Sequence, residues 1–122
     1  MKFLAPVHLD RAHEPYLAKF DCGDASLTVW LQTRAVSNEE KKASRTYLVF
    51  TDTGDLAGFF SICANVFEHN LMSAASRRNK LDPIPVVLIG RLAVDQRYQG
   101  GGLGAAMLDL AVTISRRIAE LC

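Results

Sequence analysis

One short segment restricts the fold of this chain more than any other, the stretch Gln-Gly-Gly-Gly-Leu-Gly-Ala at residues 99–105. It holds four of the chain's eight glycines, and it separates an apolar run from an amphipathic one. Glycine allows positive φ angles and removes side chains, so that a ligand can approach the backbone N–H groups. The sequence therefore predicts a strand, a tight glycine turn and a helix, in that order.

The two runs that flank this turn have different periodicities. Residues 86–94 are almost continuously apolar, which is typical of a strand buried on both faces. Gly90 interrupts the run, so we expect a bulge or a splay of the strand there. Residues 103–121 predict an amphipathic helix, whose apolar stripe is formed by Leu103, Met107, Leu110, Ala111, Ile114, Ile118 and Leu121.

The first half of the chain predicts helices followed by a β-hairpin. Residues 24–31 place apolar side chains at the spacing of one helix face, behind a polar capping residue. Residues 37–44 predict a second short helix or a loop. Residues 46–50 and 56–64 are rich in β-branched and aromatic side chains and flank turn residues, which predicts a hairpin.

Three positions in this framework need a separate explanation. Gly58 lies inside the second hairpin strand, which indicates a bulge or a close backbone approach. Arg91 lies within an apolar strand, so we expect it to have a carboxylate or phosphate partner. The polar connection at residues 65–83 is long for a compact domain, and such connections are usually functional or partly mobile.

Composition restricts the class of protein. The chain has 122 residues, of which 49% are hydrophobic and 22% are charged, and we expect one globular domain over residues 1–122. A net charge of +1 gives no overall electrostatic argument for nucleic acid. No apolar run is long enough to span a bilayer and no secretory signal is present, so we expect a cytoplasmic protein without a membrane partner. The three cysteines form no CxxC pair and the histidines show no metal spacing, which predicts neither a disulfide framework nor a metal site.

The start of the predicted helix adds free N–H donors and a partial positive charge to the glycine turn. Together they form a site for an anion such as phosphate or pyrophosphate. A nucleotide-binding P-loop would end in Lys and Ser or Thr, whereas this turn ends in Leu103-Gly104-Ala105. A dinucleotide-binding turn would be followed by a second strand, which the remaining sequence does not supply. The alternative is a structural turn without a ligand.

A third pattern fits this turn better. Gln99-x-x-Gly102-x-Gly104, led by Arg97 and preceded by a strand that ends Arg-Leu-Ala-Val, resembles the acyl-CoA signature of the GCN5-related N-acetyltransferases (GNAT). The resemblance implies an α+β fold with a mixed sheet, N-terminal helices, a β-hairpin, a splayed central strand and an acyl-CoA-binding helix. It implies that the strand pairs with the pantetheine arm of acetyl-CoA and that the turn holds the pyrophosphate. The expected cofactor-binding residues are Leu92, Ala93, Val94, Arg97, Gln99, Gly100, Gly101, Gly102, Leu103, Gly104 and Ala105.

Three separated motifs, at residues 20–35, 57–64 and 83–111, narrow the resemblance. Their order and spacing are similar to those of bacterial toxins that acetylate the amino group of aminoacyl-tRNA and are neutralised by a ribbon-helix-helix antitoxin. The resemblance implies acetyl-CoA, aminoacyl-tRNA and such an antitoxin as partners. It also makes three basic residues of the long connection candidates for contact with tRNA phosphates, namely Arg77, Arg78 and Lys80.

The chain departs from this toxin pattern in two ways. The catalytic acid of those toxins is a tyrosine beyond the helix after the turn, and none of Tyr16, Tyr47 and Tyr98 occupies that place, so no catalytic residue is assigned. Tyr98 is expected to support the loop. Related motifs carry Arg or Lys where this chain has Gly101, which predicts a weaker acetyl-CoA site that Arg97 compensates in part.

The chain ends within or just after the predicted helix, so we expect the C-terminal strands of the fold to be missing. Such a chain is expected to form a homodimer, to borrow strands from a partner or to be marginally stable, because it leaves an open sheet edge and uncovered apolar surface. Acyl transfer also needs a donor for the developing oxyanion, for which a backbone N–H near Ala93 or Val94 is the candidate. Two functions follow: an acetyl-CoA-dependent N-acetyltransferase acting on aminoacyl-tRNA, or a shortened inactive module of the same fold that binds an antitoxin or itself. A generic phosphate-binding domain is a third.

Overall fold

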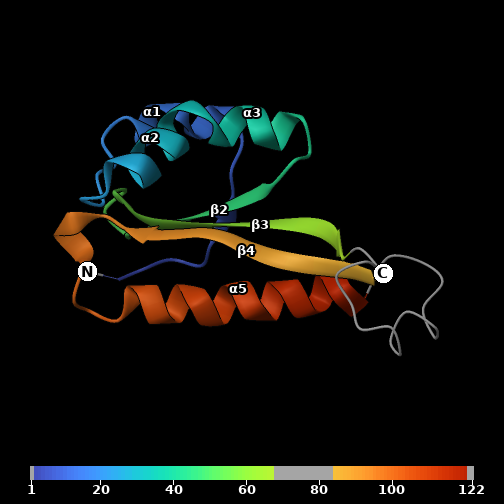
Figure 1. Cartoon of the computed structure of the whole chain (residues 1–122). Coiled ribbons are helices and arrows are strands. Elements are labelled where there is room, and N and C mark those ends of the chain that lie inside the picture. Colours follow the sequence, from blue (N-terminus) through green and yellow to red (C-terminus); the bar gives the residue numbers. More distant parts are fainter. Residues whose placement is uncertain (1, 68–83, 121–122) are drawn as a thin grey trace.

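An antiparallel sheet between two helical layers forms the framework of the structure (Figure 1). The computed structural model describes residues 2–67 and 84–120. Along the chain the elements are β1 (Val7–His8), the 3-10 helix η1 (Arg11–His13), α1 (Glu14–Leu17), α2 (Ala25–Thr33), α3 (Ala35–Glu40), β2 (Arg45–Phe50), β3 (Leu56–Phe67), β4 (Ile84–Val94), the 3-10 helix η3 (Gln96–Tyr98) and α5 (Leu103–Glu120). The α+β fold expected from the sequence is confirmed.

The sheet has the strand order β1-β2-β3-β4, and every pair among the described residues is antiparallel. The predicted hairpin is present as β2 and β3, although β3 continues to Phe67 and therefore includes the first residues of the predicted connection. Residues 68–83 lie outside the described part of the chain. Within this part β4 forms one edge of the sheet, so one side of its backbone is unpaired.

The bulge predicted at Gly90 is present in β4. Ser61 of β3 pairs with Arg91, whereas the next residue, Ile62, pairs with Ile89, so Gly90 has no partner across the ladder. A bulge of this kind bends the strand that carries the extra residue. The bend lies ten residues before Gly100, the first glycine of the turn, in the strand where the sequence predicted it.

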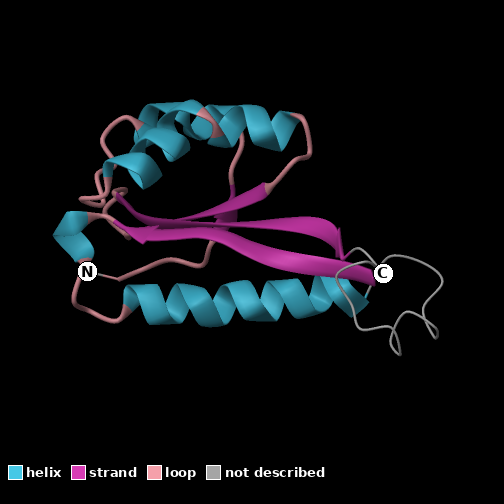
Figure 2. Cartoon of the chain, in the orientation of Figure 1, coloured by secondary structure: helices cyan, strands magenta, loops and turns pink. Residues whose placement is uncertain are grey.

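Figure 2 shows helices on both faces of the sheet. Two apolar clusters join these helical layers to the sheet. The first packs Leu31 of α2 against Leu48 and Phe59, and it also contains Ala93 of β4. The second packs Met107 and Ala111 of α5 against Phe60 and its neighbours. Of the predicted stripe of α5, Leu103, Met107 and Ala111 are buried and Ile114 and Ile118 are half-buried, whereas Leu110 is 37% exposed because it lies at the flank of the buried face. Leu121 lies outside the described residues.

Gly58 is the point where α5 and β4 both come close to β3. A Cβ atom built at this position would lie 3.1 Å from the carbonyl oxygen of Ala93 and 2.9 Å from the Met107 side chain. The Ala93 oxygen belongs to the backbone and cannot move independently of the strand. The prediction of a close backbone approach at Gly58 is therefore confirmed.

The buried carboxylate of Asp95, 2% exposed, connects three segments just after β4. It accepts hydrogen bonds from the Asp21 N–H (3.1 Å), the Arg97 N–H (2.9 Å) and the Arg97 Nε (3.0 Å). Its own N–H donates to the Ala57 carbonyl at 2.8 Å. Burial alone would raise the pKa of Asp95, but the hydrogen bonds from Arg97 and Asp21 outweigh it, and the net pKa is lowered.

Replacing Gly58 by alanine is expected to lower the free energy of unfolding by about 1–3 kcal/mol, because the added methyl group overpacks the contact with Ala93 and Met107. Thermal unfolding followed by circular dichroism measures this change. Gly101→Ala is the matched control, because a Cβ at Gly101 meets nothing within 4 Å. Equal melting temperatures for the two variants would contradict the close approach.

Replacing Asp95 by asparagine is expected to destabilise the fold by about 2–3 kcal/mol at neutral pH, because the charge-assisted hydrogen bonds are lost. The pKa of Asp95 is lower in the folded protein than its ordinary value of 3.8. The carboxylate therefore contributes its full stabilisation above pH 3.8, and this stabilisation is lost as the pH falls through the folded pKa. Chemical denaturation of both proteins at a series of pH values measures the difference. A gap between wild type and Asp95→Asn that does not narrow in acid would contradict this role.

Candidate functional site

The glycine turn presents bare backbone at the start of α5. Gly100 and Gly102 both have φ = +86°, a left-handed conformation that favours glycine. Cβ atoms at Gly100, Gly101 and Gly102 would meet nothing within 4 Å, so the space beside this backbone is open. The first N–H groups of α5, which begins at Leu103, have no intrahelical acceptor. The turn therefore offers several N–H donors and a helix N-terminus to one anion.

The side chain of Gln99 anchors this turn. Its Nε2 donates to the carbonyl oxygen of Val94 at 2.9 Å and to that of Cys22 at 2.8 Å. The first bond ties the turn to the last residue of β4, and the second ties it to the segment that precedes α2. Gln99 is one of the predicted cofactor-binding residues. Its side chain holds the turn in position through these two bonds.

The free edge of β4 carries a defined set of backbone groups. Asp95 donates its N–H to Ala57, the residue opposite it, and hydrogen-bonded pairs alternate along an antiparallel ladder. The N–H of Ala93 therefore points at Phe59 of β3, whereas the N–H groups of Leu92 and Val94 point outward. The Gln99 bond to the Val94 carbonyl agrees with this direction. Of the two candidate donors, Ala93 and Val94, the geometry favours Val94.

Arg97 is paired with two carboxylates. Its Nε lies 3.0 Å from Asp95 Oδ1, and its Nη1 lies 3.7 Å from Asp55 Oδ2. The hydrogen bond with Asp95 is the main cause that raises the pKa of Arg97. Because both carboxylates balance its charge, Arg97 brings little net positive potential to the turn. The structure gives little support to the expectation that Arg97 replaces the cation absent at Gly101.

Tyr98 supports the loop, as the sequence predicted. Its hydroxyl donates to Asp55 Oδ2 at 2.6 Å, and its ring makes an edge contact with Phe3 at a centroid distance of 6.1 Å. The hydrogen bond to Asp55 is the main cause that raises the pKa of Tyr98 above its ordinary value. The hydroxyl therefore stays protonated at neutral pH and is engaged within the loop.

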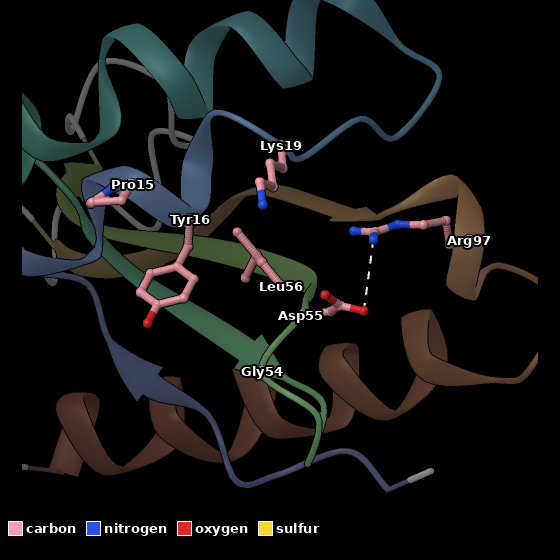
Figure 3. A pocket seen from close by; sticks show the side chains of 7 residues that line it. All are labelled: Pro15, Tyr16, Lys19, Gly54, Asp55, Leu56 and Arg97. Carbon is pink, nitrogen blue, oxygen red and sulfur yellow. Dashed lines mark ion pairs between the residues drawn. The ribbon is translucent and has the colours of Figure 1, made fainter.

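A pocket of about 410 Å³ lies beside the turn, on the side of the α1–α3 layer (Figure 3). Its lining residues are Pro15, Tyr16, Lys19, Gly54, Asp55, Leu56 and Arg97. Figure 3 shows Arg97 directed at Asp55, with the side chain of Lys19 above Leu56. Arg97 is the one residue that the pocket shares with the predicted cofactor-binding set, so the pocket is separate from the open face of the glycine turn.

Arg91 has a partner that the sequence did not predict. Its guanidinium lies over the indole ring of Trp30, with Cζ 4.2 Å from the ring centroid. The sequence indicated a carboxylate or phosphate, because the cross-sheet position of Trp30 cannot be deduced from spacing along the chain. The basic residues predicted for tRNA contact, Arg77, Arg78 and Lys80, lie outside the described residues.

In residues 2–67 and 84–120, no three His, Cys, Asp or Glu side chains are grouped in a way that could hold a metal ion. Within the same residues, no helix combines the length and apolar character needed to cross a membrane.

Comparison with known proteins identifies relatives that share this architecture. A curated relative, the tRNA-acetylating toxin of Mycobacterium tuberculosis (strain ATCC 25618 / H37Rv), is 34% identical over 110 residues, which are 90% of this chain. The chain spans 64% of that relative's length, slightly less than two thirds.

Three solved structures of related proteins are similar in fold. A crystal structure of AtaTR bound with AcCoA is 28% identical, with a TM-score of 0.82 over 99% of this chain and 72% of that one. AtaT complexed with acetyl-methionyl-tRNAfMet is 30% identical, with a TM-score of 0.66 over 80% and 60%. The AtaT Y144F mutant toxin bound to the C-terminus of the antitoxin AtaR is 25% identical, with a TM-score of 0.75 over 99% and 68%.

A family model matches nearly the whole chain. The model described as the acetyltransferase (GNAT) family covers residues 9–121, which include β2, β3, the bulged strand β4 and the glycine turn. The match agrees with the bulge at Gly90, the outward N–H groups of β4 and the open backbone before α5. The chain therefore belongs to the GNAT family of acetyltransferases.

Proposed function

We propose that this chain binds acetyl-CoA at the glycine turn and transfers the acetyl group to an amine, and that the acceptor is the amino group of aminoacyl-tRNA. The observation that carries the proposal is the open backbone at Gly100–Gly102, at the end of a bulged edge strand. The acetyl-CoA named with AtaTR and the tRNA named for the mycobacterial relative support the two substrates.

The residues of this chain fit the parts of acetyl-CoA in order. The N–H groups at the start of α5 suit the pyrophosphate, because three glycine positions leave room for its oxygens. The outward backbone groups of Leu92 suit the amide-rich pantetheine arm. The N–H of Val94 suits the thioester carbonyl oxygen, where negative charge develops during acyl transfer. Acetyl-CoA supplies the activated acyl group, and the chain supplies binding and orientation.

No tyrosine in the described residues is assigned as the acid that protonates the departing thiol. The hydroxyl of Tyr98 is bonded to Asp55, and the ring of Tyr47 stacks on Phe60 at a centroid distance of 5.3 Å. Tyr16 lines the pocket whose lining includes none of the residues of the glycine turn. The rate enhancement proposed for this chain therefore comes from proximity and from the Val94 N–H.

A second function is a non-catalytic GNAT module that binds an antitoxin or a second copy of itself. The unpaired edge of β4 favours it, because an exposed strand edge is a surface for pairing with another chain. The antitoxin bound to AtaT supports an antitoxin as partner. Its ribbon-helix-helix class and the homodimer of this chain remain predictions of the sequence.

The affinity for acetyl-CoA should be sensitive to an alanine at position 102 but not to an alanine at position 101. Gly102→Ala is expected to weaken binding at least tenfold, because φ = +86° is strained for alanine. Gly101→Ala should bind acetyl-CoA with the affinity of the wild type. Gly101→Arg should bind it about twofold to fivefold more tightly, because the added cation attracts the negatively charged pyrophosphate. Isothermal titration calorimetry measures all three.

Equal affinity of the wild type, Gly101→Ala and Gly102→Ala proteins would contradict the assignment of the turn as the acetyl-CoA site. Absence of any binding by a folded wild-type chain would contradict the proposed function as a whole.

Turnover separates the two functions. Incubation of the chain with acetyl-CoA and charged tRNA should yield N-acetylaminoacyl-tRNA, and Gly102→Ala should reduce the yield at limiting acetyl-CoA. Chromatography of the released acetylamino acid measures the product. Acetyl-CoA binding without product would favour the non-catalytic module.

A further inference from the structure

Arg91 is an exposed cation held in one place by an aromatic side chain. Its Cζ lies 4.2 Å from the ring centroid of Trp30 on α2. Trp30 lies nearly parallel to the ring of Phe59, with centroids 6.1 Å apart and an interplanar angle of 13°. Phe59 is fully buried in the core. Stacking on Phe59 thus fixes the indole of Trp30, and the guanidinium of Arg91 is attracted to the face of this indole.

No carboxylate of residues 2–67 and 84–120 forms an ion pair with Arg91. By contrast, Arg97, six residues later, is paired with Asp95 and Asp55. No hydrogen bond from the Arg91 guanidinium to another described residue is found, so its N–H donors can bind a ligand while Cζ stays over the ring. Such a planar fork matches the oxygens of a phosphate group.

Arg91 is also close to the proposed acyl site. It precedes Ala93 by two residues on the same face of β4, a separation of about 6.6 Å along a strand. Ala93 packs in the cluster beneath the α1–α3 layer, and the outward N–H of Val94 follows it directly. The α1–α3 layer packs on one face of the sheet near Val94 and α5 packs on the other, so a large acceptor would approach Val94 from the open edge of β4.

We propose that Arg91, fixed on Trp30, binds the phosphate of the 3′-terminal nucleotide of the acceptor RNA and so places the aminoacyl amine beside Val94. This inference rests on the proposed function, since it names how the acceptor is bound. In charged tRNA, one ribose and the amino acid itself separate the amine from that phosphate. A fixed cation near the acyl site therefore determines where the amine arrives, and Arg91 is a positioning and specificity residue.

The test compares Arg91→Ala with Arg117→Ala, which removes an exposed arginine from α5 on the opposite side of the sheet. The probe is a fluorescent acceptor-stem hairpin ending in CCA, and anisotropy gives its Kd at several salt concentrations. Arg91→Ala is expected to raise the Kd about tenfold and to make the slope of log Kd against log salt shallower by about 0.7, the loss of one phosphate contact. Arg117→Ala should change neither.

Two further measurements separate this role from a general effect on the fold. Arg91→Lys keeps the charge but loses the planar fork, so its salt slope should match that of the wild type while its Kd is several-fold higher. The affinity of Arg91→Ala for acetyl-CoA should equal that of the wild type. A loss of acetyl-CoA affinity together with RNA affinity would show a structural role and overturn the inference.

The outcomes also distinguish this inference from the proposed function. Equal Kd values and equal salt slopes for the wild type, Arg91→Ala and Arg117→Ala would overturn the role of Arg91 and leave the acetyltransferase proposal intact. A wild-type chain that binds acetyl-CoA but not the hairpin at any salt concentration would overturn RNA as the acceptor, and the inference with it.

Discussion

The carboxylate of Asp95 is the interaction on which the candidate site depends. It accepts hydrogen bonds from the backbone of Asp21 and from both the backbone and the side chain of Arg97, while its own N–H extends the β3–β4 ladder to Ala57. One buried group therefore fixes the end of β4, the direction of η3 and the segment before α2. Gln99 adds a second connection across the same junction, since it bonds to Val94 and Cys22. The glycine turn can be side-chain-free and still well placed because its neighbours are fixed in this way.

Much of the fold could be predicted because strong local signals coincide with the observed elements. The period of α5, the β-branched hairpin and the glycines at positive φ are each determined by chemistry within a few residues. β1 and α1 were not predicted, because segments of two and four residues carry no measurable periodicity. The sequence placed Leu110 on the buried stripe because helical periodicity gives the position of each side chain around the helix. It does not give the width of the face that packs on the sheet.

The site was predicted less completely than the fold, and the reason is long-range contact. The sequence located the turn and the strand, but it could not show that Arg97 is balanced by Asp55, forty-two residues earlier in the chain, or that Arg91 lies on Trp30. Nor could it show which N–H groups of β4 face outward, because that depends on the register with β3. Among the described residues, two arginines of one motif thus differ in their partners: Arg97 pairs with two carboxylates, and Arg91 pairs with an aromatic ring.

The extra residue at Gly90 has a consequence for how such a chain tolerates change in length. Because Ile89 and Arg91 already pair with adjacent residues of β3, both halves of β4 would keep their register if Gly90 were absent. Most single-residue deletions in a strand would invert the faces of everything on one side of them. Loss of Gly90 would instead straighten the strand while its core contacts persist. The position therefore allows the shape of the strand edge to evolve separately from the packing of the sheet.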